Sequence, residues 1–131
     1  MSTEERSGLR RALSRFVAPQ QQVHAEQERE VAVKLGGHAI SELAPRQPAT
    51  VCGTLRSVTL RPRAGVPALV AELYDGTGTL SVVWLGRRQI GGIEPGRRIR
   101  VRGMVTEAGG NRVVYNPRYE LVPSGPTDGT G

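Results

Sequence analysis

The feature that most constrains the fold is the stretch 51–122, in which short apolar-alternating runs are separated by glycine-containing turns at regular intervals. Alternation of apolar and polar residues is typical of β-strands that bury one face. Near its centre the string Leu73-Tyr74-Asp75-Gly76-Thr77-Gly78-Thr79-Leu80 joins two such runs through a turn of the kind that a β-hairpin needs. This stretch therefore predicts a series of hairpins.

Five strands are expected, at 51–60, 69–74, 80–85, 98–105 and 113–121, the last of them irregular because it contains Pro117. The first strand changes phase after Arg56, which predicts a bulge near Ser57. The segment 86–96 between the third and fourth strands is long enough for one or two helical turns. No helix alternates with the strands, and a two-sheet sandwich needs more strands than these. The fold class is accordingly an all-β core, a partly open five-stranded Greek-key barrel of the OB-fold type, preceded by one or two N-terminal helices.

The rest of the chain divides into shorter parts. Residues 1–36 are expected to form a helical or partly disordered arm, 37–47 a linker, 48–122 the barrel, and 123–131 a disordered tail. Helical spacing predicts one short amphipathic helix over 2–16 and a second over 23–35, with Pro19 and the following glutamines between them. Ile40 and Leu43 of the linker are expected to plug the edge of the barrel.

Charge indicates what such a barrel binds. The 131-residue chain carries a net charge of +6, and residues 48–131 hold eleven basic against six acidic side chains, a net charge of +5. A basic module has polyanions as natural partners. Seventeen of the eighteen basic residues are arginines in a chain rich in Ala, Gly, Pro and Val, as a GC-rich genome encodes, so arginine identity alone carries little information.

Several classes of protein are not expected. Cys52 is the one cysteine and only two histidines accompany it, so neither a disulfide nor a structural zinc site is expected, nor any other cofactor. No apolar run approaches the roughly 18 residues of a membrane-spanning helix, which predicts no membrane partner and a cytoplasmic location. The carboxylates are scattered and Cys52 has no neighbouring histidine, so the chain is expected not to be an enzyme.

A resemblance adds to this interpretation. The strings Val51-Cys52-Gly53-Thr54-Leu55, Leu73 to Leu80, 95–103 and Asn116-Pro117-Arg118-Tyr119 resemble bacterial nucleic-acid-binding OB domains, most of all the wedge domain of RecG-type branched-DNA helicases. The resemblance covers roughly residues 40–122. It implies DNA binding and an aromatic side chain on the third strand for base stacking, with Trp84 or a neighbour at that position. It does not imply the helicase motor, because the chain contains no phosphate-binding Gly-x-x-x-x-Gly-Lys motif.

The candidate site follows from where OB-folds place their ligands, on strands two and three and the flanking loops. The candidate nucleic-acid-binding residues are Arg56, Arg61, Arg63, Tyr74, Trp84, Arg87, Arg88, Arg98, Arg100, Arg102 and Arg112. Trp84 either packs in the core or stacks on bases, and the row formed by Arg98, Arg100 and Arg102 either extends a phosphate track or decorates the far side. Tyr115 and Tyr119 are interpreted as structural. Asp75, Gly76 and Gly78 are expected to shape a turn and not to catalyse a reaction.

The leading hypothesis is a non-enzymatic module that binds single-stranded or branched DNA, or RNA, with little sequence specificity. The alternative is an adaptor that docks on a protein partner through the barrel or the N-terminal helices, with arginines that only maintain solubility.

Overall fold

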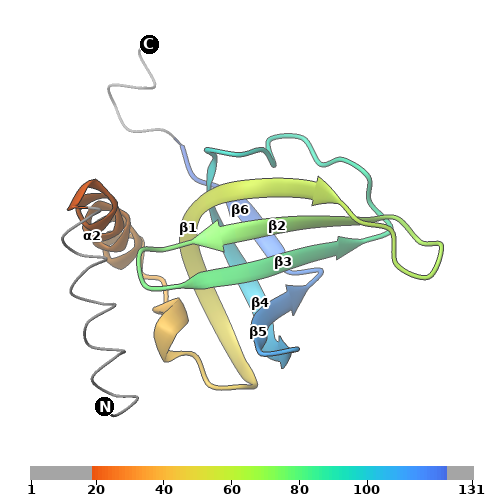
Figure 1. Cartoon of the computed structure of the whole chain (residues 1–131), viewed down its shortest axis with the longest axis horizontal. Helices are drawn as coiled ribbons and strands as arrows, with labels where there is room; N and C mark the ends of the chain where they lie inside the picture. Colours follow the sequence, from red (N-terminus) through yellow and green to blue (C-terminus); the bar gives the residue numbers. More distant parts are fainter. Residues whose placement is uncertain (1–18, 124–131) are drawn as a thin grey trace, which may run out of the picture.

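A computed structural model describes residues 19–123, so the helix expected over 2–16 and the tail 124–131 lie outside the described residues. The described elements, shown in Figure 1, are α2 (Pro19–Lys34), the short 3-10 helix η1 (Ile40–Glu42), β1 (Gln47–Leu60), β2 (Ala68–Tyr74), β3 (Thr79–Leu85), β4 (Arg98–Ala108), β5 (Asn111–Tyr115) and β6 (Arg118–Leu121). Helix α2 lies against one end of the strands, beside the β2–β3 turn.

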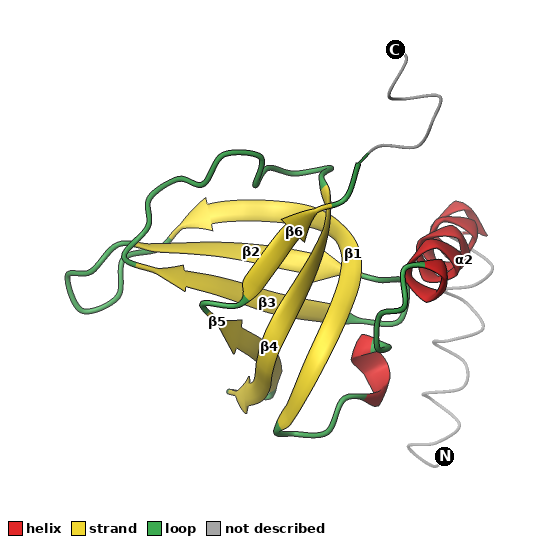
Figure 2. Ribbon diagram, turned by 180° about the vertical axis from the view of Figure 1, so that it is seen from behind, coloured by secondary structure: helices red, strands yellow, loops and turns green. Residues whose placement is uncertain are grey.

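Five of the strands close into a ring. The long strand β1 pairs with β4 over 47–54 and with β2 over 54–60, both antiparallel. β2 pairs antiparallel with β3, β3 pairs in parallel with β5, and β5 pairs antiparallel with β4. The pairing of β4 with β1 closes the ring. This confirms the OB-fold expected from the strand pattern. β6 lies outside the ring and pairs with β4 on the side that Figure 2 shows.

Strand β1 bends so that it can pair with β4 in one half of the barrel and with β2 in the other. The bend lies where the change of phase in the apolar pattern predicted a bulge. The β1–β2 register shifts between Leu55 and Ser57, which confirms the predicted bulge. A β-bulge bends a strand and increases its twist. Gly53, just before the bulge, passes so close to β2 that an added Cβ would lie 2.9 Å from the Tyr74 carbonyl carbon, which leaves no space for a side chain.

The core is built from one side of each ring strand. The largest fully buried side chains include Leu55, Leu73, Leu80, Val82 and Ile99. Ile40 and Leu43 join this cluster, as the linker pattern predicted. The linker is therefore packed on the barrel, and at Gly37 an added Cβ would lie 2.8 Å from the Cys52 backbone nitrogen.

Three local expectations are corrected. The expected final strand is two strands, because Asn116 has a φ of +47° and Pro117 follows it, a combination that breaks the ladder between β5 and β6. The segment 86–97 forms successive turns, with no helical turn, and fills the barrel end with Ile90 and Ile93. The helix expected over 23–35 covers Pro19–Lys34, so it also includes Pro19 and the glutamines that were expected to interrupt the helical pattern.

Helix α2 is polar for a packed helix. Among the side chains of residues 21–34, only those of Glu28 and Ala32 are buried, at 7% and 1% exposed. Hydrogen bonds and ion pairs to the barrel therefore contribute much of its attachment. No helix in the described residues combines the length and hydropathy that crossing a bilayer requires.

Candidate nucleic-acid interface

The β2–β3 turn fixes one end of the site. The Oδ1 atom of Asp75 accepts hydrogen bonds from the backbone N–H groups of Thr77 and Gly78 at 2.8 and 3.1 Å, and from the Thr77 hydroxyl at 2.6 Å. Gly76 has a φ of +90°, and α2 packs so closely on it that an added Cβ would lie 2.9 Å from the Arg29 backbone nitrogen. The turn has the form that the sequence predicts, and no catalytic group is needed to explain Asp75.

Strands β2, β3 and β5 hold a second, small apolar cluster on their outward side. Leu69, Ala71 and Leu73 of β2 point into the core, so the alternate residues point outward. A cluster separate from the core collects Ala68, Val70, Val83 and Val113 from the three strands. We call the surface formed by these four residues, with Glu72, Ser81, Tyr74 and Tyr115 of the same strands, the outer face.

An arginine–tyrosine pair lies at each end of the outer face. The Arg56 guanidinium carbon lies 3.4 Å from the centroid of the Tyr74 ring. At the other end the corresponding distance from Arg63 to the Tyr115 ring is 5.7 Å, and an Arg63 N–H group donates a 3.1 Å hydrogen bond to the Tyr115 hydroxyl. Both pairs are cation–π contacts of the kind that arginine makes with exposed aromatic rings.

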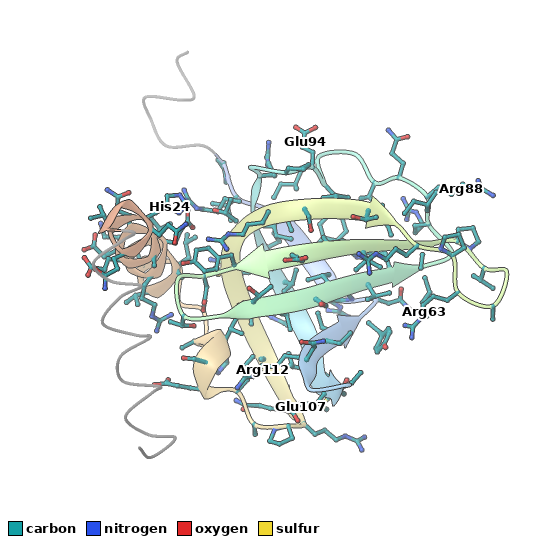
Figure 3. All side chains as sticks on the ribbon, in the orientation of Figure 1. His24, Arg63, Arg88, Glu94, Glu107 and Arg112 are labelled. Atoms are coloured by element: carbon teal, nitrogen blue, oxygen red, sulfur yellow. The ribbon has the colours of Figure 1, made fainter. Side chains whose placement is uncertain are left out.

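Strand register gives the separation of the two pairs. Tyr74 lies opposite Thr79 of β3, and Tyr115 lies opposite Val83, four residues further along the same strand. At about 3.3 Å per residue and about 4.8 Å between strands, the tyrosine Cα atoms are about 16 Å apart. Figure 3 shows Arg63 at the end of the barrel far from α2 and its His24. The pairs therefore bracket a strip a few nucleotides long.

The predicted site arginines separate into four groups, the last of which is the row on β4 formed by Arg98, Arg100 and Arg102. Arg56, Arg61 and Arg63 are exposed beside the outer face, in the β1 bulge and the loop after β1. Arg87 and Arg88 are exposed in the turn segment after β3. Arg112 donates a 3.3 Å hydrogen bond to the Ser41 carbonyl and so braces η1.

The arginine row of β4 lies on a different part of the surface from the outer face. Arg98 forms a 3.4 Å ion pair with Glu28 of α2, and Arg100 donates a 3.0 Å hydrogen bond to the Leu35 carbonyl, while Arg102 bonds the Thr50 hydroxyl at 3.3 Å. The pKa of Arg100 is raised, first by Cys52, which is its cross-strand neighbour, and then by the Glu120 carboxylate. Arg100 therefore stays cationic. Two members of this row thus hold the helix.

The side chain of Trp84 packs in the core. It belongs to the core cluster and is 5% exposed, with the Tyr119 ring packed edge-on at a centroid distance of 5.6 Å. Little of the ring is therefore open to a base at the surface. The core-packing alternative that the sequence left open is the one that the structure has.

Three residues of the site were not among the sequence candidates. Tyr115 was interpreted as structural, yet it is 38% exposed and pairs with Arg63. Its alternation with Val114, which is in the core, is the signal that could have placed Tyr115 on the outside. Gln21 and His24 of α2 line an open pocket with Arg56 and Tyr74. No pattern around Gln21 or His24 could have indicated this, because the docking of α2 on the β2–β3 turn is a tertiary contact.

Fold and surface together define a small OB-fold binding module with an arginine- and tyrosine-bracketed outer face. Residues 49–123, more than half of the chain, match the family described as OB-fold nucleic acid binding domain, of the tRNA anticodon type. The chain belongs to this family.

Comparisons with individual proteins add one solved structure. The chain is similar to RecG in the structure of RecG bound to a three-way DNA junction, with 22% sequence identity and a TM-score of 0.49, over 65% of this chain. The match covers 12% of that RecG chain, so this chain spans a small part of its length. A comparison with curated proteins finds no significant match.

Proposed function

We propose that this protein binds single-stranded nucleic acid, or the single-stranded part of branched DNA, along the outer face with little sequence preference and without catalysis. The observation that carries the proposal is the pair of arginine–tyrosine contacts, Arg56 with Tyr74 and Arg63 with Tyr115, at the two ends of the outer face. The family of OB-fold nucleic acid binding domains supports it.

The chemistry of the outer face suits a single strand. Aromatic rings and guanidinium planes stack on any base, while arginines neutralise phosphates and release counterions. Between the pairs Val70 is partly exposed and packs on Val83 and Val113, which are 4% and 7% exposed, so Val70 is the apolar side chain that a base can reach there. None of these contacts distinguishes one base from another, which is the basis for the expected weak sequence preference.

The cellular setting is part of the same proposal. Cys52 is free and buried, at 0% exposed, which suits a reducing compartment. We place the protein in a bacterial cytoplasm, where single-stranded and forked nucleic acids occur.

Among residues 19–123 no three His, Cys, Asp or Glu side chains gather as metal ligands would.

The test is a binding series by fluorescence anisotropy, with labelled single-stranded, duplex and forked oligonucleotides at several salt concentrations. The proposal predicts tighter binding to single-stranded and forked DNA than to duplex, weakening as salt rises. Equal affinity for duplex and single strands, or no binding at low salt, would contradict it. An RNA strand of the same sequence, run in parallel, determines whether the 2′-hydroxyl matters.

One observation favours a second candidate, a protein-interaction module. Leu60, Val66 and Leu85, at the barrel end next to Pro62 and Pro67, are 45%, 46% and 42% exposed. Exposed apolar side chains in one place are typical of protein-binding surfaces. Recovery of a partner by affinity pull-down after nuclease treatment would favour this function, whereas nuclease-sensitive recovery would favour the first.

A further inference from the structure

Helix α2 and the outer face enclose an open pocket of about 630 Å³, which we call the α2 pocket. Its described lining residues are Gln21 and His24 from α2, with Arg56 and Tyr74 from the barrel. The volume lies within the range of about 300 to 1,000 Å³ that is usual for small-ligand sites. The pocket adjoins the end of the outer face that Arg56 and Tyr74 mark.

The floor of the α2 pocket is a flat cation. The Arg56 guanidinium carbon is 3.4 Å from the centre of the Tyr74 ring, so one face of the guanidinium is covered by the ring. The opposite face of the same plane remains for another flat group. Nucleobases stack on arginine planes as they do on aromatic rings.

The wall that α2 contributes is polar and adaptable. Gln21 offers both a carbonyl acceptor and amide donors, and the two ring nitrogens of His24 offer a donor and an acceptor according to the tautomer. Both side chains are exposed and open to a ligand. Base edges carry donors and acceptors side by side, and glutamine pairs well with such edges. A phosphate group, which only accepts, would not need this mixture.

We infer that the α2 pocket holds one unstacked nucleobase of the bound strand, which stacks on Arg56 while Gln21 and His24 contact its edge. The inference rests on the proposed function, because the base belongs to a strand that lies along the outer face. It makes α2 part of the binding site. The attachment of the helix through Glu28 to Thr54 and Arg98 then positions the wall of the pocket.

The test compares two probes in titrations of the full-length protein at low salt. The first is a phosphodiester strand of about eight abasic units, within the site size of one OB-fold, and the second is the same strand with one central adenine. Wild type is expected to bind the adenine-bearing strand about fivefold or more tightly, because one stacked base contributes about 1 kcal/mol or more. The double variant Gln21→Ala, His24→Ala is expected to show a clearly smaller preference than wild type, because the base loses its edge contacts while the stack on Arg56 remains.

Gln27→Ala, an exposed glutamine of the same helix outside the pocket lining, is the matched control and should keep the preference. If the double variant keeps the full preference for the adenine-bearing strand, the inference is wrong, while the proposed function stands provided that wild type binds single strands. Absence of binding by wild type to ordinary single-stranded DNA overturns both. Free adenosine monophosphate should compete weakly, and competition at lower concentration than the one-base strand would identify a free-nucleotide site and overturn the inference.

Discussion

The buried carboxylate of Asp75 accepts a 2.9 Å hydrogen bond from the backbone N–H group of Ile40, 35 residues earlier in the chain. Its Oδ2 atom also lies 3.9 Å from the guanidinium of Arg29 in α2. The other oxygen closes the β2–β3 turn through Thr77 and Gly78. One side chain thus joins the turn beside Tyr74 to the linker and to the helix that lines the α2 pocket.

Asp75→Ala is expected to lower the free energy of unfolding by about 3 kcal/mol, because the backbone donors that it satisfies would be left without a partner. Urea denaturation measures the change. Glu107→Ala, which removes an exposed carboxylate, is the control and should stay within about 0.5 kcal/mol of wild type. A similar small effect for Asp75→Ala would contradict the assigned role.

Gly76→Ala should be more damaging than Gly86→Ala, although both glycines have positive φ, of +90° and +77°. An added Cβ meets no atom within 4 Å at Gly86, whereas at Gly76 it meets the Ala25 carbonyl and Arg29 of α2. Gly86→Ala therefore costs only the backbone strain of about 1–2 kcal/mol, and Gly76→Ala adds the loss of helix docking. Thermal unfolding measures both variants, and equal destabilisation would show that α2 does not press on the turn.

Glu28→Ala should release α2 while the barrel stays folded. Glu28 accepts a 2.9 Å hydrogen bond from the Thr54 hydroxyl and pairs with Arg98, and few apolar contacts remain to hold this polar helix. Amide hydrogen exchange should show protection lost over 25–34 and retained in β1 and β4. Glu30→Ala, at an exposed position on the same helix, should leave protection unchanged. Retained protection in Glu28→Ala would mean that other contacts hold the helix.

Arg56→Ala and Arg63→Ala should each weaken binding to single-stranded DNA several-fold and reduce the slope of log affinity against log salt by about one. Each removes a cation next to a tyrosine on the outer face. Arg46→Ala removes an exposed arginine of the linker and should leave the slope as in wild type. Three equal effects would mean that net charge, and not this face, determines affinity.

Trp84→Phe tests the assignment of this residue to the core. The smaller ring leaves unfilled space in a cluster where Trp84 is 5% exposed, so the free energy of unfolding should fall by about 1–3 kcal/mol. Affinity for single-stranded DNA, measured under conditions where the variant is fully folded, should not change. A loss of affinity with stability unchanged would restore Trp84 to the binding site.

Most of the fold could be predicted from the strand pattern, because a strand that buries one side has apolar residues at every second position. The bulge near Ser57 and the plug formed by Ile40 and Leu43 could be predicted for the same reason. The break at Asn116 was missed since it depends on one backbone conformation, φ of +47°, which a hydrophobic pattern does not record. The segment 86–96 was expected to allow one or two helical turns because of its length, but it forms turns from which Ile90 and Ile93 pack into the core.

The candidate site was harder to predict because outward-facing side chains leave no periodic signal that separates one surface from another. Arg56 was a candidate because OB-folds place ligands beside its strand, and Tyr74 because it lies opposite the core register; the structure places the two side chains in contact. Arg98 and Arg100 had the densest basic pattern, yet they hold α2. That contact joins residues 65 or more positions apart in the chain, and local sequence does not encode it.

The most direct test of the central claim is to map the backbone amide shifts of the isotope-labelled protein by heteronuclear NMR during titration with single-stranded DNA. The account predicts that the shifts concentrate on the outer face and its two ends, at Val70, Ser81, Val83 and Tyr115 and around Arg56 and Tyr74. Shifts concentrated instead on β4 and β6, around Arg102, Arg118 and Glu120, would contradict it.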